Sequence, residues 1–146
     1  MSWKAHENIE ITKEVLKEWV NSYVNKDYYQ WGIVVKQTNE LIGSIGIVGN
    51  IENRLICEMG YCIEKNYWGN GYVVEAFNRI IEFLFTETNC NRIEAVHDVD
   101  NVNSGKVIIK CNLEFEGVLR DRGLNNDLKL IDLAMYFLLK RDYLRK

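Results

Sequence analysis

Apolar side chains recur along this chain with two different periods, which predict where helices and strands form. Two segments, 12–25 and 72–87, place an apolar residue every three or four positions, the spacing of one face of an α-helix. Thr12 is a suitable N-cap for the first segment. The two apolar stripes consist of Val15, Leu16, Trp19, Val20, Tyr23 and Val24, and of Val73, Phe77, Ile80, Ile81 and Leu84. We therefore predict two amphipathic helices that bury these stripes.

Shorter apolar runs predict strands. The chain has no proline, so Gly, Asn and Asp mark its turns. The predicted strands are 31–36, 41–48, 54–63, 92–97, 113–121 and 128–139, with a short helix at 101–112 and a charged tail at 140–146. The first three strands would form an antiparallel meander. The helix at 72–87 would then return the chain to a parallel neighbour, which predicts a mixed α/β sheet with a β-α-β crossover at its centre.

Length and charge narrow the class of protein. A chain of 146 residues that is 47% hydrophobic is long enough for one domain, residues 1–146, and short for two. Its net charge of −3 argues against a nucleic-acid or membrane-surface partner. No apolar run reaches the roughly 20 residues of a membrane span, and the polar start lacks a signal peptide, so we expect a cytoplasmic protein. Four scattered cysteines without metal-ligand spacing predict reduced thiols and no metal site.

The stretch NYWGNGY, residues 66–72, places two glycines directly before the second predicted helix. A Walker loop would need Gly-Lys-Ser/Thr, and a dinucleotide fingerprint would need a third glycine and a later acid. Neither pattern is present. The glycine pair alone leaves two readings open, a tight turn or a cradle for a phosphate group at a helix N-terminus.

Three ordered segments carry a family resemblance: EMGYCIEKNYWGNGYVVEAFNRIIEFLF, NRIEAVHDVDNVNSGKVIIKCNLEFEGVLRD and DLAMYFLLKRDY. Together they resemble the GNAT superfamily of N-acetyltransferases, in particular the branch that acetylates ribosomal-protein N termini. The resemblance covers residues 31–143. It implies an α/β (α+β) GNAT fold, in which a mixed, mostly antiparallel sheet contains a splayed strand pair and is flanked by helices. It also implies acetyl-coenzyme A as cosubstrate.

The resemblance assigns coenzyme contacts residue by residue. The family's pyrophosphate loop matches residues 66–71, and backbone groups near the end of the preceding strand pair with the pantetheine arm. A later Asn contacts the pantetheine, and a Lys on the following helix is within reach of a phosphate, although a solvated lysine is an equal alternative. The implied set is Tyr61, Cys62, Ile63, Asn66, Gly69, Asn70, Gly71, Tyr72, Val73, Asn101 and Lys106.

The chain departs from the family pattern at several positions. Asn66 replaces the usual Gln or Arg, and Gly105 stands where a larger residue is usual. Ile108 occupies the position of the tyrosine that protonates the leaving thiolate in most members, which leaves Ser104 as the candidate acid. About forty residues of the family pattern are not matched before Trp3. We therefore expect an N-terminally short domain in which another copy covers an edge, most simply a homodimer.

Catalysis of acyl transfer to an amine needs a base and an acid near the thioester. Glu58 is the candidate base, because it lies on the strand before the loop, on one face with Gly60 and Cys62. The alternative is a surface Glu paired with a cross-strand Lys or Arg. His97 is a weaker candidate base. Three aromatics, Tyr28, Tyr29 and Trp31, would line an acceptor pocket or belong to the core.

The resemblance implies an N-acetyltransferase that transfers acetyl from acetyl-coenzyme A to a primary amine by direct attack. The acceptor stays open between a protein N-terminal amine and a small-molecule amine. Two other classes remain: a coenzyme A-binding module with weak or no catalysis, and a general α/β interaction domain that binds no coenzyme. Binding of coenzyme A and release of its thiol separate the three classes.

Overall fold

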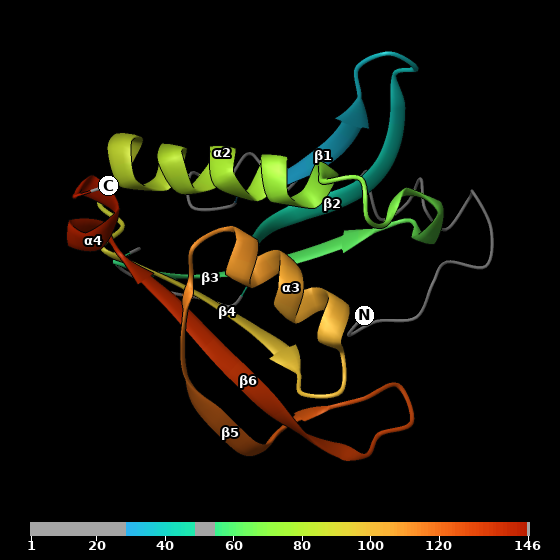
Figure 1. Cartoon of the computed structure of the whole chain (residues 1–146), viewed down its shortest axis with the longest axis vertical. Coiled ribbons are helices and arrows are strands. Elements are labelled where there is room, and N and C mark those ends of the chain that lie inside the picture. The colour runs from blue at the N-terminus through green and yellow to red at the C-terminus, as the bar shows by residue number, and fades with distance from the viewer. Residues whose placement is uncertain (1–28, 49–54, 146) are drawn as a thin grey trace.

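The computed structural model describes residues 29–48 and 55–145 (Figure 1). The helix expected at 12–25, Tyr28, and the turn at 50–53 lie outside these residues. Six strands form one sheet in the order β1-β2-β3-β4-β6-β5. The strands are β1 (Gln30–Val35), β2 (Glu40–Val48), β3 (Ile56–Ile63), β4 (Arg92–Asp98), β5 (Glu114–Leu124) and β6 (Leu130–Leu139). The helices are η1 (Lys65–Tyr67), α2 (Tyr72–Glu87), α3 (Val102–Lys110) and α4 (Lys140–Leu144).

The connectivity confirms the predicted mixed sheet. Strands β1, β2 and β3 pair as an antiparallel meander, and β4 and β5 each pair with β6 in antiparallel register. Among the strands that the structure describes, the single parallel pair is β3 with β4, joined through α2. Because a parallel pair needs a crossover, α2 is the central β-α-β connection that the sequence predicts.

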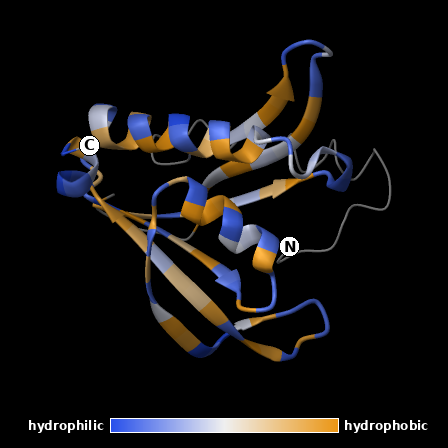
Figure 2. Ribbon diagram, in the orientation of Figure 1, coloured by the Kyte–Doolittle hydropathy of each residue, from blue (hydrophilic) through white to orange (hydrophobic). Residues whose placement is uncertain are grey.

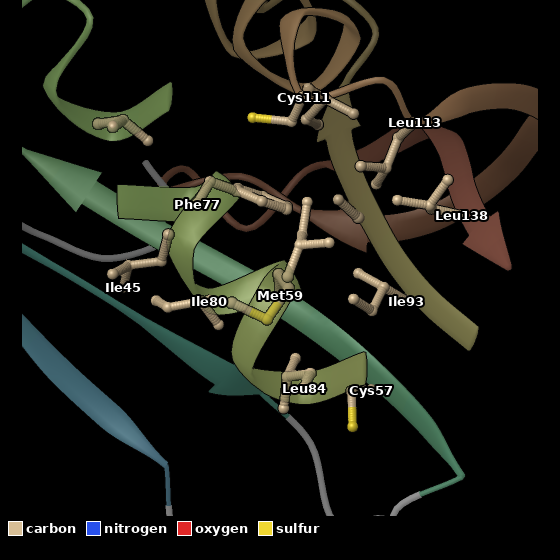
Figure 3. Packing of buried hydrophobic residues seen from close by; sticks show 14 of the residues in the cluster. Ile45, Cys57, Met59, Phe77, Ile80, Leu84, Ile93, Cys111, Leu113 and Leu138 are labelled. Atoms are coloured by element: carbon tan, nitrogen blue, oxygen red, sulfur yellow. The ribbon is translucent and has the colours of Figure 1, made fainter. Parts of the chain in front are cut away.

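Helices α2 and α3 lie on the same face of the sheet (Figure 1). Both crossovers move in the same direction across the sheet, so right-handed connections bring both helices to one face. The apolar stripe of α2 faces the strands and its polar side faces outward (Figure 2). Side chains such as Phe77 and Leu84 pack there on Met59 and Ile93 (Figure 3). Burial of each such side chain favours folding by about 1.5–3 kcal/mol. This contact therefore fixes the position of α2 on the sheet.

The parallel pair separates halfway along β3. Its register runs from Ile56 opposite Arg92 to Met59 opposite Ala95 and then stops. Beyond this point β3 continues to Ile63 alongside β2, and β4 continues to Asp98 alongside β6. The ends of the two strands point apart in Figure 1. The splayed strand pair that the resemblance implies is therefore present.

Three local predictions need correction. A short helix, η1, follows β3, where the sequence predicted only a loop. Strand β5 runs on to Leu124, because Gly123 and Leu124, which the sequence placed in the turn, pair with Ile131 and Leu130 after a register shift that follows Leu119. The charged tail begins with α4, whose Tyr143 ring packs 5.2 Å from the ring of Phe85. This aromatic contact orders a segment that looks polar in sequence.

Candidate active site

The glycine loop joins η1 to α2 in a left-handed conformation. Gly69 and Gly71 have φ angles of 79° and 78°. A Cβ built on either glycine would meet no protein atom within 4 Å. The left-handed backbone therefore favours glycine at both positions, and the space beside both residues is open. Between them, the side-chain amide of Asn70 donates to the carbonyl oxygens of Tyr67 and Trp68 at 3.3 and 3.4 Å, which fixes the loop from within.

The start of α2 has no side-chain cap. Gly71 is the N-cap, and its carbonyl accepts the first helical bond from the amide of Glu75 at 3.0 Å. The first amides of a helix lack intrahelical partners, and the helix dipole places partial positive charge there. Tyr72 and Val73 belong to this first turn. Open space, glycine backbone and a helix N-terminus together fit an anionic group such as a pyrophosphate.

One side-chain contact links β3 to α3 across the splay. The hydroxyl of Tyr61 lies 2.7 Å from Ser104 Oγ and 2.9 Å from the Ser104 carbonyl oxygen. The Tyr61 ring also lies edge-on to Phe77 of α2, with centroids 6.1 Å apart. Burial raises the pKa of Tyr61 to about 12, against the opposing effect of its bond to Ser104. Sequence reasoning assigned Tyr61 only a backbone contact and missed this hydroxyl.

Glu58 lies at the apex of the splay, one residue before the last parallel pair. Met59 beside it is buried on the helix side, so alternation places Glu58 on the opposite face of the sheet. The pKa of the Glu58 carboxyl is raised, first by burial and then by the charge of Glu94, while Arg122 opposes the shift. Ser104 lies on α3. Glu58 and Ser104 therefore occupy opposite faces at the same splayed end.

One arginine, Arg92, pairs with the carboxylates near Glu58. Arg92 Nε donates to Glu94 Oε1 at 2.7 Å, and its Nη2 donates to Glu116. Its guanidinium carbon also lies 4.9 Å from the centroid of the Phe137 ring. Glu94 is thus paired, whereas Glu58 has no salt bridge with any residue that the structure describes. Glu94 and Glu116 are the carboxylates that Arg92 pairs, whereas the cation that acts on the pKa of Glu58 is Arg122.

The remaining expected coenzyme residues surround the same end of the fold. The end of β3 beyond its pairing with β4, η1, the loop and the first turns of α2 and α3 all lie toward the right of Figure 1. The Ile63 carbonyl accepts a bond from Trp68 Nε1 at 3.1 Å, and the Asn101 side chain caps α3 by accepting from the Ser104 amide at 3.3 Å. Cys62 is half-buried, and Asn66 and Lys106 are exposed.

A family model described as an acetyltransferase (GNAT) domain matches residues 1–114. The chain belongs to the GNAT family of acetyltransferases. The glycine loop, the splay and the helix start after β3 are therefore parts of a GNAT domain.

One curated relative of this GNAT domain is an uncharacterised N-acetyltransferase, p20, from Bacillus licheniformis. The two are 38% identical over 114 residues, which cover 78% of this chain and 64% of the relative. The chain thus spans less than two thirds of the length of this relative.

Solved structures share the GNAT fold. The microcin C7 self-immunity acetyltransferase MccE, in complex with acetyl-CoA and AMP, has a TM-score of 0.84 at 22% identity, covering 95% of this chain and 76% of the MccE chain. The ribosomal-protein-S5-alanine acetyltransferase from Vibrio fischeri has a TM-score of 0.80 at 21% identity, covering 97% and 80%. At these identities the likeness establishes the fold.

Two departures from the GNAT pattern have a structural explanation. Ile108 is fully buried, so its position belongs to the core beneath α3. A Cβ at Gly105 would lie 2.8 Å from His97 Nε2, so the absent side chain makes room for this ring. The ring is held by a 2.7 Å contact from Nδ1 to the Asp98 carbonyl and by stacking on Tyr136 at 5.5 Å. His97 thus packs beneath α3.

Tyr29 and Trp31 pack against the core of this GNAT domain. Tyr29 stacks on Trp31 with ring centroids 5.7 Å apart, and both meet the edge of Phe83 on α2 at 5.9 Å. The pocket alternative is not supported for these two rings. All four cysteines lie outside any disulfide. Within residues 29–48 and 55–145, no helix is long and apolar enough to cross a membrane, and no metal-ligand cluster occurs.

Proposed function

We propose that this GNAT domain is an acetyl-coenzyme A-dependent N-acetyltransferase that acts by direct attack of a primary amine. One observation carries the proposal: the open glycine loop at the start of α2 adjoins a splay with a carboxylate on one face and paired hydroxyls on the other. Acetyl-coenzyme A, when bound, supplies an acetyl group activated as a thioester. Proximity of the two partners then provides a large part of the rate.

The coenzyme is held mainly by backbone groups. Amides of the loop and of the first turn of α2 bind the pyrophosphate, supported by the helix dipole. Beyond Met59, the edge of β3 that has separated from β4 hydrogen-bonds the pantetheine arm, as a further strand would. Asn101 orients its amide toward the same arm, and Lys106 provides a solvent-exposed cation for a phosphate. The open space around the glycines and the absence of a side-chain cap on α2 support this assignment.

Glu58 acts as the general base. Its raised pKa makes the carboxylate a better proton acceptor than an ordinary Glu, and its face is opposite the helices. It takes the proton from the acceptor amine, directly or through water. Ser104 acts on the other face, where its hydroxyl stabilises the departing sulfur. A positioned base contributes about 10²- to 10⁴-fold to the rate.

The acceptor is a protein N-terminal amine or a small-molecule amine. Glu58 and Glu94 are neighbours in the β3–β4 register. Two carboxylates on neighbouring strands favour a cationic acceptor. The test is a panel of N-terminal peptides and small amines, with release of the coenzyme thiol as the readout. Thiol release that depends on an amine supports the proposal. Tight binding of coenzyme A without release in the whole panel would instead support a non-catalytic binding module.

The chain also forms a single domain that self-associates. Among the described residues β1 pairs only with β2, so its other edge is open, and Val34 on it is 47% exposed. Open strand edges favour pairing with another chain. Light scattering over a dilution series should give at least a dimer, and a monomer at every concentration would contradict it. Four cysteines that lie outside any disulfide fit a reducing compartment, so we place the protein in the cytoplasm.

A further inference from the structure

The contact between Tyr61 and Ser104 contains more information than its distances. Tyr61 reaches from β3 across the splay to α3, and its hydroxyl lies within hydrogen-bond distance of two oxygens of one residue. These two oxygens differ in chemistry. The Ser104 carbonyl only accepts, whereas the Ser104 hydroxyl both donates and accepts.

Counting protons gives two arrangements. A phenol has one proton, so when Tyr61 donates to the Ser104 carbonyl, the Ser104 hydroxyl must donate its own proton to the phenol oxygen. When Tyr61 donates to Ser104 Oγ instead, the serine O–H no longer points at the phenol and can donate to another acceptor. The two arrangements differ only by rotation of two hydroxyl groups, because both acceptor oxygens already lie within 2.9 Å.

We infer that Tyr61 is a positioning residue, which orients the Ser104 hydroxyl so that its proton points at the sulfur of the coenzyme. This inference rests on the proposed function and deepens it. Donation from the phenol to Ser104 Oγ polarises the serine O–H and strengthens the bond it donates in turn. Without the phenol, a helical serine tends to turn back and bond the carbonyl one turn earlier.

Tyr61 acts through a hydrogen bond and keeps its own proton. Burial raises its pKa to about 12, whereas an ordinary thiol has a pKa of about 8.5. Moving the phenol proton to the thiolate would therefore be uphill. The sulfur leaves as a thiolate that accepts a bond from Ser104, and solvent protonates it later.

The experiment measures the pKa of enzyme-bound coenzyme A thiol. Thiolate absorbance is followed against pH, with the complex of desulfo-coenzyme A, which lacks the thiol, as the blank for protein thiols and phenols. A hydrogen bond to the thiolate lowers this pKa. Tyr61→Phe keeps the ring against Phe77 and should raise the bound thiol's pKa by about half a unit to one unit, the value of one hydrogen bond. Ser104→Ala should raise it at least as much.

A double variant gives the decisive comparison. If Tyr61 acts through Ser104, the Tyr61→Phe change has no further effect on the thiol pKa in a Ser104→Ala background. Ser104→Thr retains a hydroxyl and should keep the bound thiol's pKa close to its wild-type value. In an acetylation assay, Tyr61→Phe should lower kcat about 3- to 10-fold, the value of one hydrogen bond, and leave KM for acetyl-coenzyme A unchanged.

Tyr136→Phe is the matched control. It removes another buried phenol, near His97 at 3.5 Å, and should leave the thiol pKa unchanged. A Tyr61→Phe variant that only melts earlier, with an unchanged thiol pKa, would overturn the inference. So would additive effects of the two substitutions. If coenzyme A binds but Tyr61→Phe leaves the thiol pKa unchanged, only this inference fails. If coenzyme A does not bind the wild-type protein, the proposed function fails too.

Discussion

The coenzyme loop and the splay are neighbours that encode their chemistry in opposite ways. The loop is a run of consecutive residues whose conformation is set locally, by two glycines in the left-handed region. The splay is assembled from distant parts of the chain, and its central contact joins residues 43 positions apart. Local encoding predicts a binding element that can be read from a short stretch. Assembly from distant segments predicts residues whose roles depend on one another.

The largest expected effect comes from the carboxylate at the splay. Glu58→Gln keeps size and polarity but removes the base, so turnover should fall by about 10²- to 10⁴-fold while coenzyme A affinity stays unchanged. Steady-state kinetics and calorimetry measure the two quantities. Retention of full turnover would make Glu58 an acceptor contact only.

Stability provides the control for this variant. A raised folded-state pKa means that the protonated Glu58 favours folding and that ionisation weakens the fold as pH rises through that pKa. Glu58→Gln cannot ionise, so at neutral pH it should melt slightly above the wild type, by at most about 2 °C because the side chain is only half-buried. Lost turnover in a protein of this stability cannot be ascribed to unfolding.

The loop should lose binding without losing its shape. Gly71→Asn places a side chain in the open space, and Asn tolerates the left-handed conformation better than other residues. We expect coenzyme A affinity to fall about 100-fold or more, the loss of two or more charge-assisted bonds. Calorimetry measures it. Gly117→Asn is the control, because its Cβ also meets nothing within 4 Å and lies on β5. If Gly71→Asn and Gly117→Asn bind coenzyme A with equal affinity, the loop glycines serve only to form a turn.

The smallest effect concerns pH and sharpens the contrast between cooperating and independent residues. Glu58 must be ionised to accept a proton, so kcat/KM should rise with pH through its raised pKa. Glu94→Gln removes the like charge that adds to this shift, so the acidic limb should move to lower pH by less than about one unit, with the plateau unchanged. A pH–rate profile measures the limb. An unmoved limb would mean that Glu94 does not act on the catalytic base.

The same contrast explains what the sequence predicts. The order of the six described strands and of helices α2 and α3, the antiparallel meander and the crossover follow from apolar periods and turn residues, and the structure confirms them. The glycine loop follows from a contiguous motif. The family model supports the resemblance from which the splay was expected.

Features that depend on contacts between distant segments escaped prediction. The bond from Tyr61 to Ser104 has no local signature, because either residue alone is an ordinary polar position. Helix α4 forms where Tyr143 meets Phe85, and its charged residues conceal it in the sequence. Strand β5 extends through an irregular stretch in which the Asp132 carboxylate accepts from the Asp121 amide at 2.8 Å. Tyr29 and Trp31 were ambiguous until Phe83 was placed beside them.

The fit between Gly105 and His97 has an evolutionary consequence. Any larger residue at 105 meets an imidazole that is fixed on two sides, although glycine within a helix is about 1 kcal/mol less favourable than alanine. A substitution at 105 therefore becomes favourable only after position 97 has become smaller. We therefore expect sign epistasis between the two positions, in which the order of the two substitutions decides whether the first is tolerated. Libraries that vary α3 while His97 is retained would discard variants that are sound in another background.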